Sequence, residues 1–482
     1  MKYPGDLVSR SRKPDDLLSH VSRISRVYRL MSEPDRPKRK VSVVNNVPRD
    51  SFKRLAKLSP EAMWVLAGQL GVAFAGLAGV KLLTHVLPVS EFGKLSLANT
   101  VIGFISMNLF IPFGQGLMRF WSVSNARGEL PLFYEASRRL ARYICYAVLT
   151  ADMIAFLTLN MIKNLEWSII VSISVLIGIA SGHANLRIGI FTAARQRKKT
   201  ALLETGATLA RPIGGVFMVL LIASSADVVL FGYLIVTTIV LVITELIYTQ
   251  TLVGSNNDNI QPSRRLDKEI ISYSIQFFMW QIFISIYLSC DKWAIQAYHG
   301  AEAVGAYAVV SQLAIYPLMF GSSFLHGLFL PIVYQKAGDL SNKVQRNSGF
   351  RTLSMMTGLY VLGAAALIGM FMKFHETFVL VMSNKRYVEF SYLLPILAGA
   401  WALFYYGQLL SGFGMLANKL KSFNWAKSIS TVLAVGSTIY LVKTKGVSGV
   451  AWALLGSGFV YAVWSSLVVL NLIKSNGHTD KE

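Results

Sequence analysis

Residues 62–86 read AMWVLAGQLGVAFAGLAGVKLLTHV, an apolar run with no charged residue before Lys81. About 20 such residues form a helix that crosses the roughly 30 Å hydrocarbon core of a bilayer. The chain therefore predicts an all-α polytopic membrane protein with about 12 transmembrane helices. The twelve apolar runs are 62–86, 95–118, 140–161, 168–191, 202–223, 228–249, 270–290, 306–333, 352–371, 392–413, 425–442 and 449–472.

The composition also favours a membrane protein. Of the 482 residues, 53% are hydrophobic and only 15% are charged, whereas soluble domains carry about 25% charged residues. Long apolar runs recur throughout the chain after Pro60, which argues against an appended soluble domain. Both cysteines, Cys145 and Cys290, lie inside apolar runs, so neither a disulfide framework nor a zinc knuckle is expected.

The net charge of +22 would suggest nucleic acid as a partner of a soluble protein. With the N-terminus inside, the inner loops and the C-terminal tail hold 22 Lys and Arg residues, and the outer loops hold eight. This asymmetry is the positive-inside pattern of membrane proteins. It predicts that both termini are cytoplasmic, and no nucleic-acid partner is needed to explain the charge.

Residues 1–60 form a basic cytoplasmic arm that is too polar and too long for a signal peptide. Leu17, Val21 and Ile24 recur at helical spacing among arginines. Two interpretations stay open for this arm. It is an amphipathic helix on the anionic inner leaflet, or it is a disordered tail, with Met31 as an alternative start.

The twelve spans divide into two halves around a polar loop. The division predicts an N-lobe over 61–250, a linker over 251–269, a C-lobe over 270–474 and a cytoplasmic tail over 475–482. The alignment of the two halves that matches Gln69 with Gln281 also matches Gly93 with Gly305. Six spans per half bring both halves into the bilayer from the same side. We therefore expect two pseudo-symmetric six-helix lobes around a central cavity, related by an axis along the membrane normal.

Two sets of residues, one in each half, carry a resemblance to a known family. They are Trp64, Gly68, Gln69, Pro88, Glu91, Phe92, Gly93 and Arg119, and then Asp291, Lys292, Trp293, Gly300 and Val304 to Tyr307. On these residues, the stretch from 60 to about 475 resembles the polysaccharide and O-antigen flippases. These oligosaccharide translocases belong to the multidrug/oligosaccharidyl-lipid/polysaccharide (MOP) exporter superfamily. The arm is not part of that pattern.

The resemblance implies a fold and a function. The fold is that of the MOP and MATE transporters, in which helices one, two, seven and eight line a central cavity. The cargo is an undecaprenyl-pyrophosphate-linked oligosaccharide repeat unit, flipped across the cytoplasmic (inner) membrane for exopolysaccharide or O-antigen synthesis. Polysaccharide polymerase and co-polymerase proteins are the implied partners, together with the phospholipid bilayer, and no cofactor is implied.

Charged and polar residues inside the spans are the candidates for the site, because a charge at the bilayer centre costs roughly 2.5–3.5 kcal/mol on insertion scales. Lys81 and Arg187 lie near span ends, so each either faces the cavity or reaches the interface. A pyrophosphate needs cations to leave water. The substrate candidates are Lys81, Arg119, Arg187 and Lys292, with Gln69, Asn99 and Gln281 as neutral groups and His85 and His326 as weaker ones. Asp152 and Asp291 are candidates for ion coupling or gating.

The sequence contains no phosphate-binding loop, zinc-protease motif or nucleophile elbow, and we expect neither an enzyme nor a metal site. Two alternatives stay open. One is a multidrug/cation antiporter of the same superfamily. The other is a membrane-embedded glycosyltransferase or polymerase, for which the longest outer loop, 372–391, is short. Basic candidates outnumber deep acids, which favours an anionic cargo.

Overall fold

The computed structural model describes residues 60–161, 164–253, 264–337, 343–417, 419 and 421–478. These residues all belong to one compact unit. The predictions made for the N-terminal arm fall outside the described residues, as do 254–263 of the predicted linker and 479–482 of the tail. The lobe boundaries at 250 and 270 therefore stay predictions.

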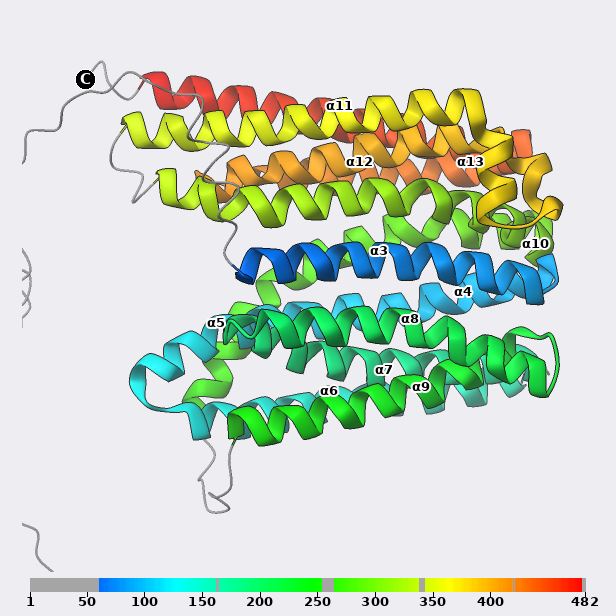
Figure 1. Cartoon of the computed structure of the whole chain (residues 1–482), viewed down its shortest axis with the longest axis horizontal. Helices are drawn as coiled ribbons and strands as arrows, with labels where there is room; N and C mark the ends of the chain where they lie inside the picture. The colour runs from blue at the N-terminus through cyan, green and yellow to red at the C-terminus, as the bar shows by residue number, and fades with distance from the viewer. Residues whose placement is uncertain are drawn as a thin grey trace, which may run out of the picture. The chain divides into compact units, whose positions relative to one another are not determined.

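Almost all of the described residues are helical, with no strand among them (Figure 1). The first half contains α3 (Pro60–Val86), α4 (Val89–Ile105), the π-helix η1 (Ser106–Phe110), α5 (Ile111–Arg127), α6 (Leu130–Met161), α7 (Leu165–Ala193), α8 (Arg197–Leu221), α9 (Ala226–Tyr248) and the π-helix η2 (Thr249–Val253). The second half contains α10 (Arg264–Ala337), α11 (Lys343–Met382), the 3-10 helix η3 (Lys385–Phe390), α12 (Leu393–Leu416) and α13 (Lys421–His478).

The helices give twelve spans, as the apolar runs predict. Nine helical stretches of the described chain are long and apolar enough to cross a membrane. Two of them, α10 and α13, each contain a single non-helical glycine, Gly300 (φ 77°) and Gly446 (φ 64°), and so contribute two spans each. A positive φ suits glycine because it has no Cβ. The twelfth span is α8, which is less apolar. The protein is therefore a multi-pass membrane protein.

Several helices start well before their apolar windows. The third span is predicted from residue 140, whereas α6 starts at Leu130 and already includes Arg138 and Arg139. Likewise α8 starts at Arg197 rather than at residue 202. Helical hydrogen bonding does not stop where the apolar window stops, so charged turns of helix extend past the hydrocarbon. Hydropathy therefore locates the spans and underestimates their length.

The helices alternate in direction, so the bundle has two distinct ends. The turn end carries the breaks at Pro88, Gly300 and Gly446, and the Pro60 end carries the beginning of α3 and the end of α13. The helices form two lobes that lie side by side, and each lobe extends from the Pro60 end to the turn end (Figure 1). The N-lobe comprises α3–α9, and the C-lobe comprises α10–α13. Helix α10 packs against α3, α4 and α5 of the N-lobe as well as against α11, α12 and α13.

The two lobes touch at the turn end through a symmetric pair of glycines. A Cβ added to Gly93 would lie 1.8 Å from the carbonyl oxygen of Ala301, and one added to Gly305 would lie 1.9 Å from that of Val89. The interval in sequence from Gly93 to Gly305 equals that from Val89 to Ala301. The same contact therefore occurs twice about one axis. This contact supports the pseudo-twofold repeat and locates its axis at the crossing of α4 and α10.

Candidate functional site

A cavity of about 500 Å³ lies between the lobes, on the same axis. Its walls come from α3, α4, η1, α7, α8 and α9 of the N-lobe and from α10 and α12 of the C-lobe. Four pairs of its lining residues are separated by the same interval in sequence as Gly93 and Gly305. They are Gly76 and Leu288, Val80 and Lys292, Asn99 and Ser311, and Gly103 and Ile315. The cavity is therefore central to the repeat.

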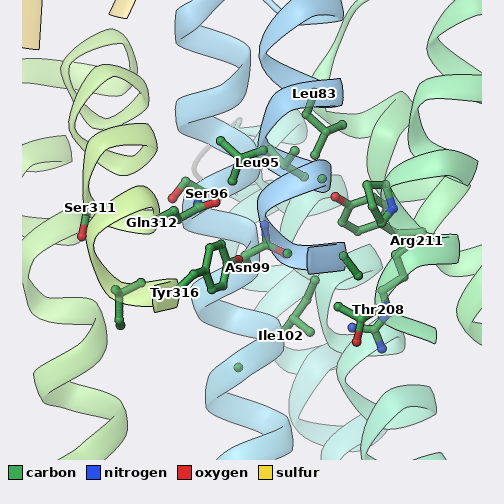
Figure 2. Close-up of a pocket in the computed structure, with 18 of the residues that line it drawn as sticks. Leu83, Leu95, Ser96, Asn99, Ile102, Thr208, Arg211, Ser311, Gln312 and Tyr316 are labelled. Carbon is green, nitrogen blue, oxygen red and sulfur yellow. The ribbon is translucent and has the colours of Figure 1, made fainter. Parts of the chain in front are cut away.

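Neutral polar side chains line much of the cavity. Figure 2 shows Asn99 of α4 between Gln312 and Tyr316 of α10 on one side and Thr208 and Arg211 of α8 on the other. Further polar lining residues are Ser96, Ser106, Ser181, Asn185, Tyr233 and Ser311. Amide and hydroxyl groups both donate and accept hydrogen bonds. Such a lining is suited to a hydroxyl-rich ligand that would otherwise stay in water.

Two cations and no acid are among the lining residues described by the structure. Arg211 lies in the middle of α8, where its Nε donates to Thr237 Oγ1 of α9 at 3.1 Å. No carboxylate of the described chain lies within 4 Å of its guanidinium. The following residue, Pro212, has no N–H, so the carbonyl of Thr208 lacks its usual helical donor. Arg211 is thus an uncompensated positive charge in the cavity wall.

Lys292, the second cation, is partly neutralised. Its Nζ lies 3.3 Å and 3.4 Å from the two carboxylate oxygens of Asp291. Asp291 is fully buried and also accepts hydrogen bonds from Tyr307 Oη (2.8 Å) and from the Lys292 backbone N–H (2.8 Å). These bonds hold the carboxylate behind Lys292. Most of the free positive charge of the cavity therefore comes from Arg211.

A second, smaller groove lies on the adjacent faces of α4 and α10. It encloses about 330 Å³. Its walls are mostly apolar, and two of its residues, Phe104 and Trp293, expose 47% and 41% of their surface. Thr100 Oγ1 accepts a hydrogen bond from Trp293 Nε1 across the groove (2.8 Å). The groove is suited to an apolar chain next to the polar cavity.

The family is shown by a sequence match. A model of the polysaccharide biosynthesis protein family matches residues 60–335, which is more than half of the chain. The chain belongs to this family. As the residues of the two halves predicted, its fold is that of the MOP transporters. No curated protein sequence matches the chain.

Solved structures of MOP transporters share the fold of this polysaccharide biosynthesis protein. An inward-facing multidrug resistance MATE transporter matches with 13% identity and a TM-score of 0.59, over 89% of this chain and 98% of its own. A MOP transporter from Pyrococcus furiosus matches with 11% identity and a TM-score of 0.59, over 93% and 100%. The lipid II flippase MurJ matches with 14% identity and a TM-score of 0.56, over 90% and 93%.

The structure brings only part of the predicted site together. Asn99 and Lys292 line the cavity, and Asp291 lies directly behind Lys292. The other predicted residues are outside the lining: Gln69, Lys81, Arg119, Asp152, Arg187 and Gln281, and also the weaker candidates His85 and His326. No group of three or more His, Cys, Asp or Glu residues that could hold a metal occurs in the described part of the chain.

Two of the residues outside the cavity join the lobes instead. Lys81 Nζ on α3 donates to the carbonyl oxygens of Val381 (2.6 Å) and Ser383 (3.1 Å) at the end of α11. Carbonyls at a helix C-terminus attract cations. Gln281 on α10 is buried, and its amide donates to the carbonyl of Met107 in η1 at 3.4 Å. Both residues therefore contribute to contacts between the lobes.

Three others also lie outside the cavity, and two of them, Arg119 and Asp152, contact a neighbouring side chain. Arg119 is exposed, with its guanidinium 4.8 Å from the ring centre of Tyr273. Asp152 accepts a hydrogen bond from Ser172 Oγ at 3.1 Å, between α6 and α7. Gln69 lies on α3, half-buried and outside the cavity lining. None of the three is among the residues that line the cavity.

Arg187 requires a correction, because it is buried inside the N-lobe. Its Nε donates to Glu245 Oε1 at 2.5 Å, and its Nη1 donates to Ser137 Oγ at 3.0 Å. The guanidinium also lies 4.3 Å from the ring centre of Tyr248, and only 2% of the residue is exposed. Its guanidinium therefore joins α7 to Ser137 of α6 and to Glu245 and Tyr248 of α9. We therefore remove Arg187 from the proposed cargo site.

Replacing Arg187 with methionine is expected to lower stability by about 3 kcal/mol, because breaking one partner of a buried ion pair leaves the other unpaired. The loss stays at the low end for a broken buried ion pair because Glu245 keeps its contact with His183 (2.8 Å). Thermal unfolding in detergent measures the loss, and the double variant Arg187→Met/Glu245→Gln should recover part of it. Loss of transport at unchanged stability would contradict this assignment.

The principal cation of the cavity, Arg211, was missed as a site residue. In the sequence, Arg211 ends the predicted inner loop 194–211 and also falls inside the apolar run 202–223. The structure places it well inside α8, several turns after the helix begins. The signal that could have found it is the pair Arg211-Pro212 within an apolar window, since an intramembrane charge next to a helix irregularity is typical of a binding site.

Proposed function

We propose that this protein flips undecaprenyl-pyrophosphate-linked oligosaccharide repeat units across the cytoplasmic membrane. The single observation that carries the proposal is Arg211, an unpaired cation in a polar cavity between two lobes. A pyrophosphate is an anion that guanidinium groups bind by paired hydrogen bonds. Membership of the polysaccharide biosynthesis family supports a glycan cargo.

The polar lining explains why a protein is needed. Moving sugar hydroxyls and phosphates through hydrocarbon without hydrogen-bond partners costs several kcal/mol per group. In the proposal, Arg211 and Lys292 meet the pyrophosphate, while Asn99, Gln312 and Tyr316 meet the first sugars. A cavity of about 500 Å³ is within the usual range for small-molecule sites. It takes the charged head and the nearest sugars, and the polyprenyl tail lies in the apolar groove between α4 and α10.

The cycle is alternating access between the two leaflets. The Gly93–Gly305 crossing holds α4 against α10 at the turn end. In the proposal this crossing is the closed gate, and the head group loads from the Pro60 end. We place the Pro60 end in the cytoplasm because the basic segments lie on that side of the spans. Rocking of the lobes would then separate α4 from α10 at the turn end and release the cargo outward.

The cation antiporter is the main rival, and the charge of the cavity weighs against it. An antiporter for cationic compounds would need acidic groups in the cavity, whereas the lining residues of the described structure include two bases and no acid. We propose transport rather than catalysis for the same cavity. Contacts with a polymerase or a co-polymerase are a further proposal that rests on the family alone.

Flipping can be tested with purified protein in liposomes. A fluorescent lipid-linked oligosaccharide is placed in both leaflets, and a membrane-impermeant reagent destroys the outer pool. We expect the protein to expose the inner pool within minutes, whereas protein-free liposomes protect about half of the label. Transport of a cationic dye in place of the glycan lipid would establish the antiporter, and sugar transfer without flipping would establish the glycosyltransferase.

A further inference from the structure

Four bases that the proposed function does not use lie at the turn between α7 and α8. They are Arg195, Arg197, Lys198 and Lys199. The turn is at the Pro60 end of the bundle, where α8 begins beside α3 (Figure 1). Arg211 of the cavity follows fourteen residues after Arg197, which is about 21 Å along the helix. The four bases are therefore separate from the proposed cargo site, and none of them lines the cavity.

None of the four bases is compensated by an acid. No carboxylate of the described chain lies within 4 Å of their side chains. Glu204, the nearest acid in the sequence, also lies beyond that distance. Other bases at the same end are paired: Arg139 donates to both carboxylate oxygens of Asp267 at 2.8 Å, and Arg265 donates to Glu269 at 2.9 Å. The α7–α8 turn thus has positive charge left for an anion from outside the chain.

Two of the bases extend outward from the turn, and a third is held in place. Arg195 is the one non-glycine residue of the described chain with a positive φ (58°), at a position after a helix where glycine or asparagine is usual. Arg195 and Lys198 are both exposed, and Lys198 Nζ lies 5.5 Å from the ring centre of Trp64 on α3. Lys199 Nζ instead donates to Thr251 Oγ1 of η2 at 2.8 Å. The charges of Arg195 and Lys198 are therefore the accessible ones.

The first turn of α8 adds two backbone donors to these charges. The residue before the helix, Gln196, makes no side-chain cap, and the backbone N–H groups of Lys198 and Lys199 have no acceptor among the described residues. Free N–H groups at a helix N-terminus favour an anion. A guanidinium binds phosphate oxygens by paired hydrogen bonds. Together, the side chains and the helix end are suited to a phosphate group.

Exposed apolar side chains continue from the turn into the membrane. Leu202 lies one turn after Lys198 on the same face of α8, and it is 56% exposed. Leu246 of α9, which precedes Thr251 in the chain, is 57% exposed. The indole of Trp64 is beside the bases, and tryptophan is typical of the membrane–water boundary. A charged group followed by apolar groups toward the bilayer is the order of a phospholipid, with its head group and then its chains.

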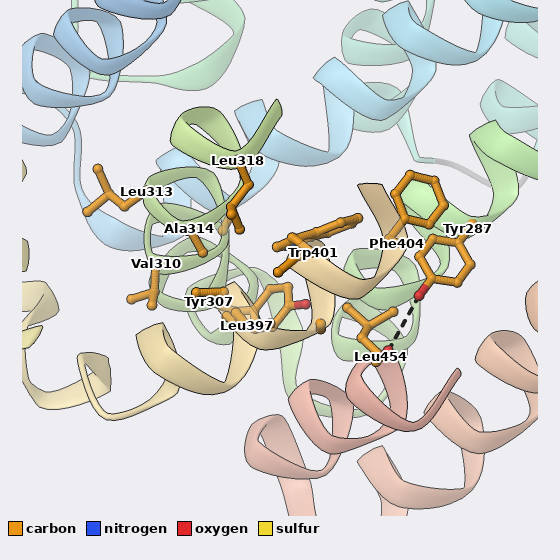
Figure 3. Close-up of a cluster of buried hydrophobic side chains, with 14 of the residues drawn as sticks. Tyr287, Tyr307, Val310, Leu313, Ala314, Leu318, Leu397, Trp401, Phe404 and Leu454 are labelled. Atoms are coloured by element: carbon orange, nitrogen blue, oxygen red, sulfur yellow. Dashed lines mark hydrogen bonds between the residues drawn. The ribbon is translucent and has the colours of Figure 1, made fainter. Parts of the chain in front are cut away.

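The C-lobe core, by contrast, is filled by its own side chains. Tyr287 stacks on Phe404 with ring centres 4.6 Å apart, and Trp401 meets both rings edge-on. Tyr287 Oη donates to the carbonyl of Leu454 at 3.4 Å (Figure 3). Lipid chains therefore lie against the exposed outer faces of the helices rather than in a core of this kind.

We propose that the α7–α8 turn binds the head group of an anionic phospholipid in the leaflet at the Pro60 end. The phosphate meets Arg195, Lys198 and the free N–H groups of α8, and an acyl chain lies beside Leu202. The unpaired bases favour a head group with net negative charge over a zwitterionic one, whose cationic group they repel. Each base near a membrane surface strengthens the binding of anionic lipid roughly fivefold. This inference does not depend on the cargo.

Thermal unfolding in detergent tests the site without any cargo, because a ligand that binds the folded protein raises its melting temperature. Phosphatidylglycerol, phosphatidylcholine or inorganic phosphate is added, and the concentration that gives half of the stabilisation is measured. For the unaltered protein, phosphatidylglycerol should act at a concentration roughly tenfold or more below that of phosphatidylcholine, and inorganic phosphate should have no effect. R195N/K198Q should need about 25-fold more phosphatidylglycerol. Asparagine suits the positive φ of residue 195, so this variant should be as stable as the unaltered protein without lipid.

The matched control is R264Q/K268Q, which removes two exposed bases of α10 at the same end of the bundle and should bind phosphatidylglycerol as the unaltered protein does. If R195N/K198Q does not fold, as judged by size-exclusion chromatography, K198Q alone replaces it, with a loss of about fivefold. An equal loss in the control would mean diffuse surface charge and overturn the proposal. Equal action of phosphatidylcholine, or the same stabilisation by inorganic phosphate alone, would also overturn it. Failure of glycan flipping would leave these lipid affinities unaffected.

Discussion

Replacing Arg211 with alanine is expected to reduce flipping of the lipid-linked oligosaccharide by roughly 10- to 100-fold. A hydrogen bond to a charged group contributes about 1.5–3 kcal/mol, and each 1.4 kcal/mol is a factor of ten. Arg211 has no carboxylate within 4 Å in the described structure, so its charge is free for the cargo. The initial rate of flipping in liposomes measures the loss. Folding should be little affected, because the replacement leaves no buried carboxylate unpaired.

Two arginine variants provide the comparison. Arg119→Ala removes an exposed guanidinium that lies over Tyr273 and outside the cavity, and it should flip at the rate of the unaltered protein. Arg211→Lys keeps the charge but loses the paired geometry of the guanidinium, so an intermediate rate is expected. If Arg211→Ala flips the glycan lipid normally, the anionic-cargo proposal is wrong, whatever the other variants do.

The fold could be predicted from the sequence because its determinant is local. An apolar run of about 20 residues specifies a membrane helix without reference to the rest of the chain, and all twelve runs became spans. The repeat was also visible, since Gly93 and Gly305 fall at the same offset as Gln69 and Gln281. The reason for those glycines was not visible. It depends on two carbonyl oxygens of the opposite lobe, which only the folded chain brings near.

The site could be predicted only in part, because hydropathy does not indicate which way a side chain points. Arg187 and Arg211 both fall inside apolar windows, and only the adjacent Pro212 distinguishes Arg211 in the local sequence. The difference is Glu245, which is distant from Arg187 in the sequence and is brought to it by the packing of α7 on α9.

Enlarging either glycine of the turn-end crossing is expected to prevent its closure. A leucine at position 93 or 305 would place its Cβ 1.8 Å or 1.9 Å from a carbonyl oxygen of the other lobe. Backbone atoms cannot move aside as a flexible side chain can, so α4 and α10 must separate. Overpacking of this kind costs about 1–3 kcal/mol, which lowers the closed population roughly 5- to 100-fold. Spin-label distances across the turn end should lengthen, and flipping should slow because one state of the cycle is lost.

Because the contact is symmetric, the prediction can be tested with two independent substitutions, one in each lobe. Gly93→Ala and Gly305→Ala meet equivalent carbonyls, so the two variants should behave alike in both distance and rate. Gly321→Ala is the matched control, because a Cβ at Gly321 on α10 would meet nothing within 4 Å and alanine favours the helix by up to about 1 kcal/mol. If Gly93→Ala and Gly305→Ala match that control, the crossing is not the closure of the turn end. If only one of them slows flipping, the two lobes do not close symmetrically about the axis.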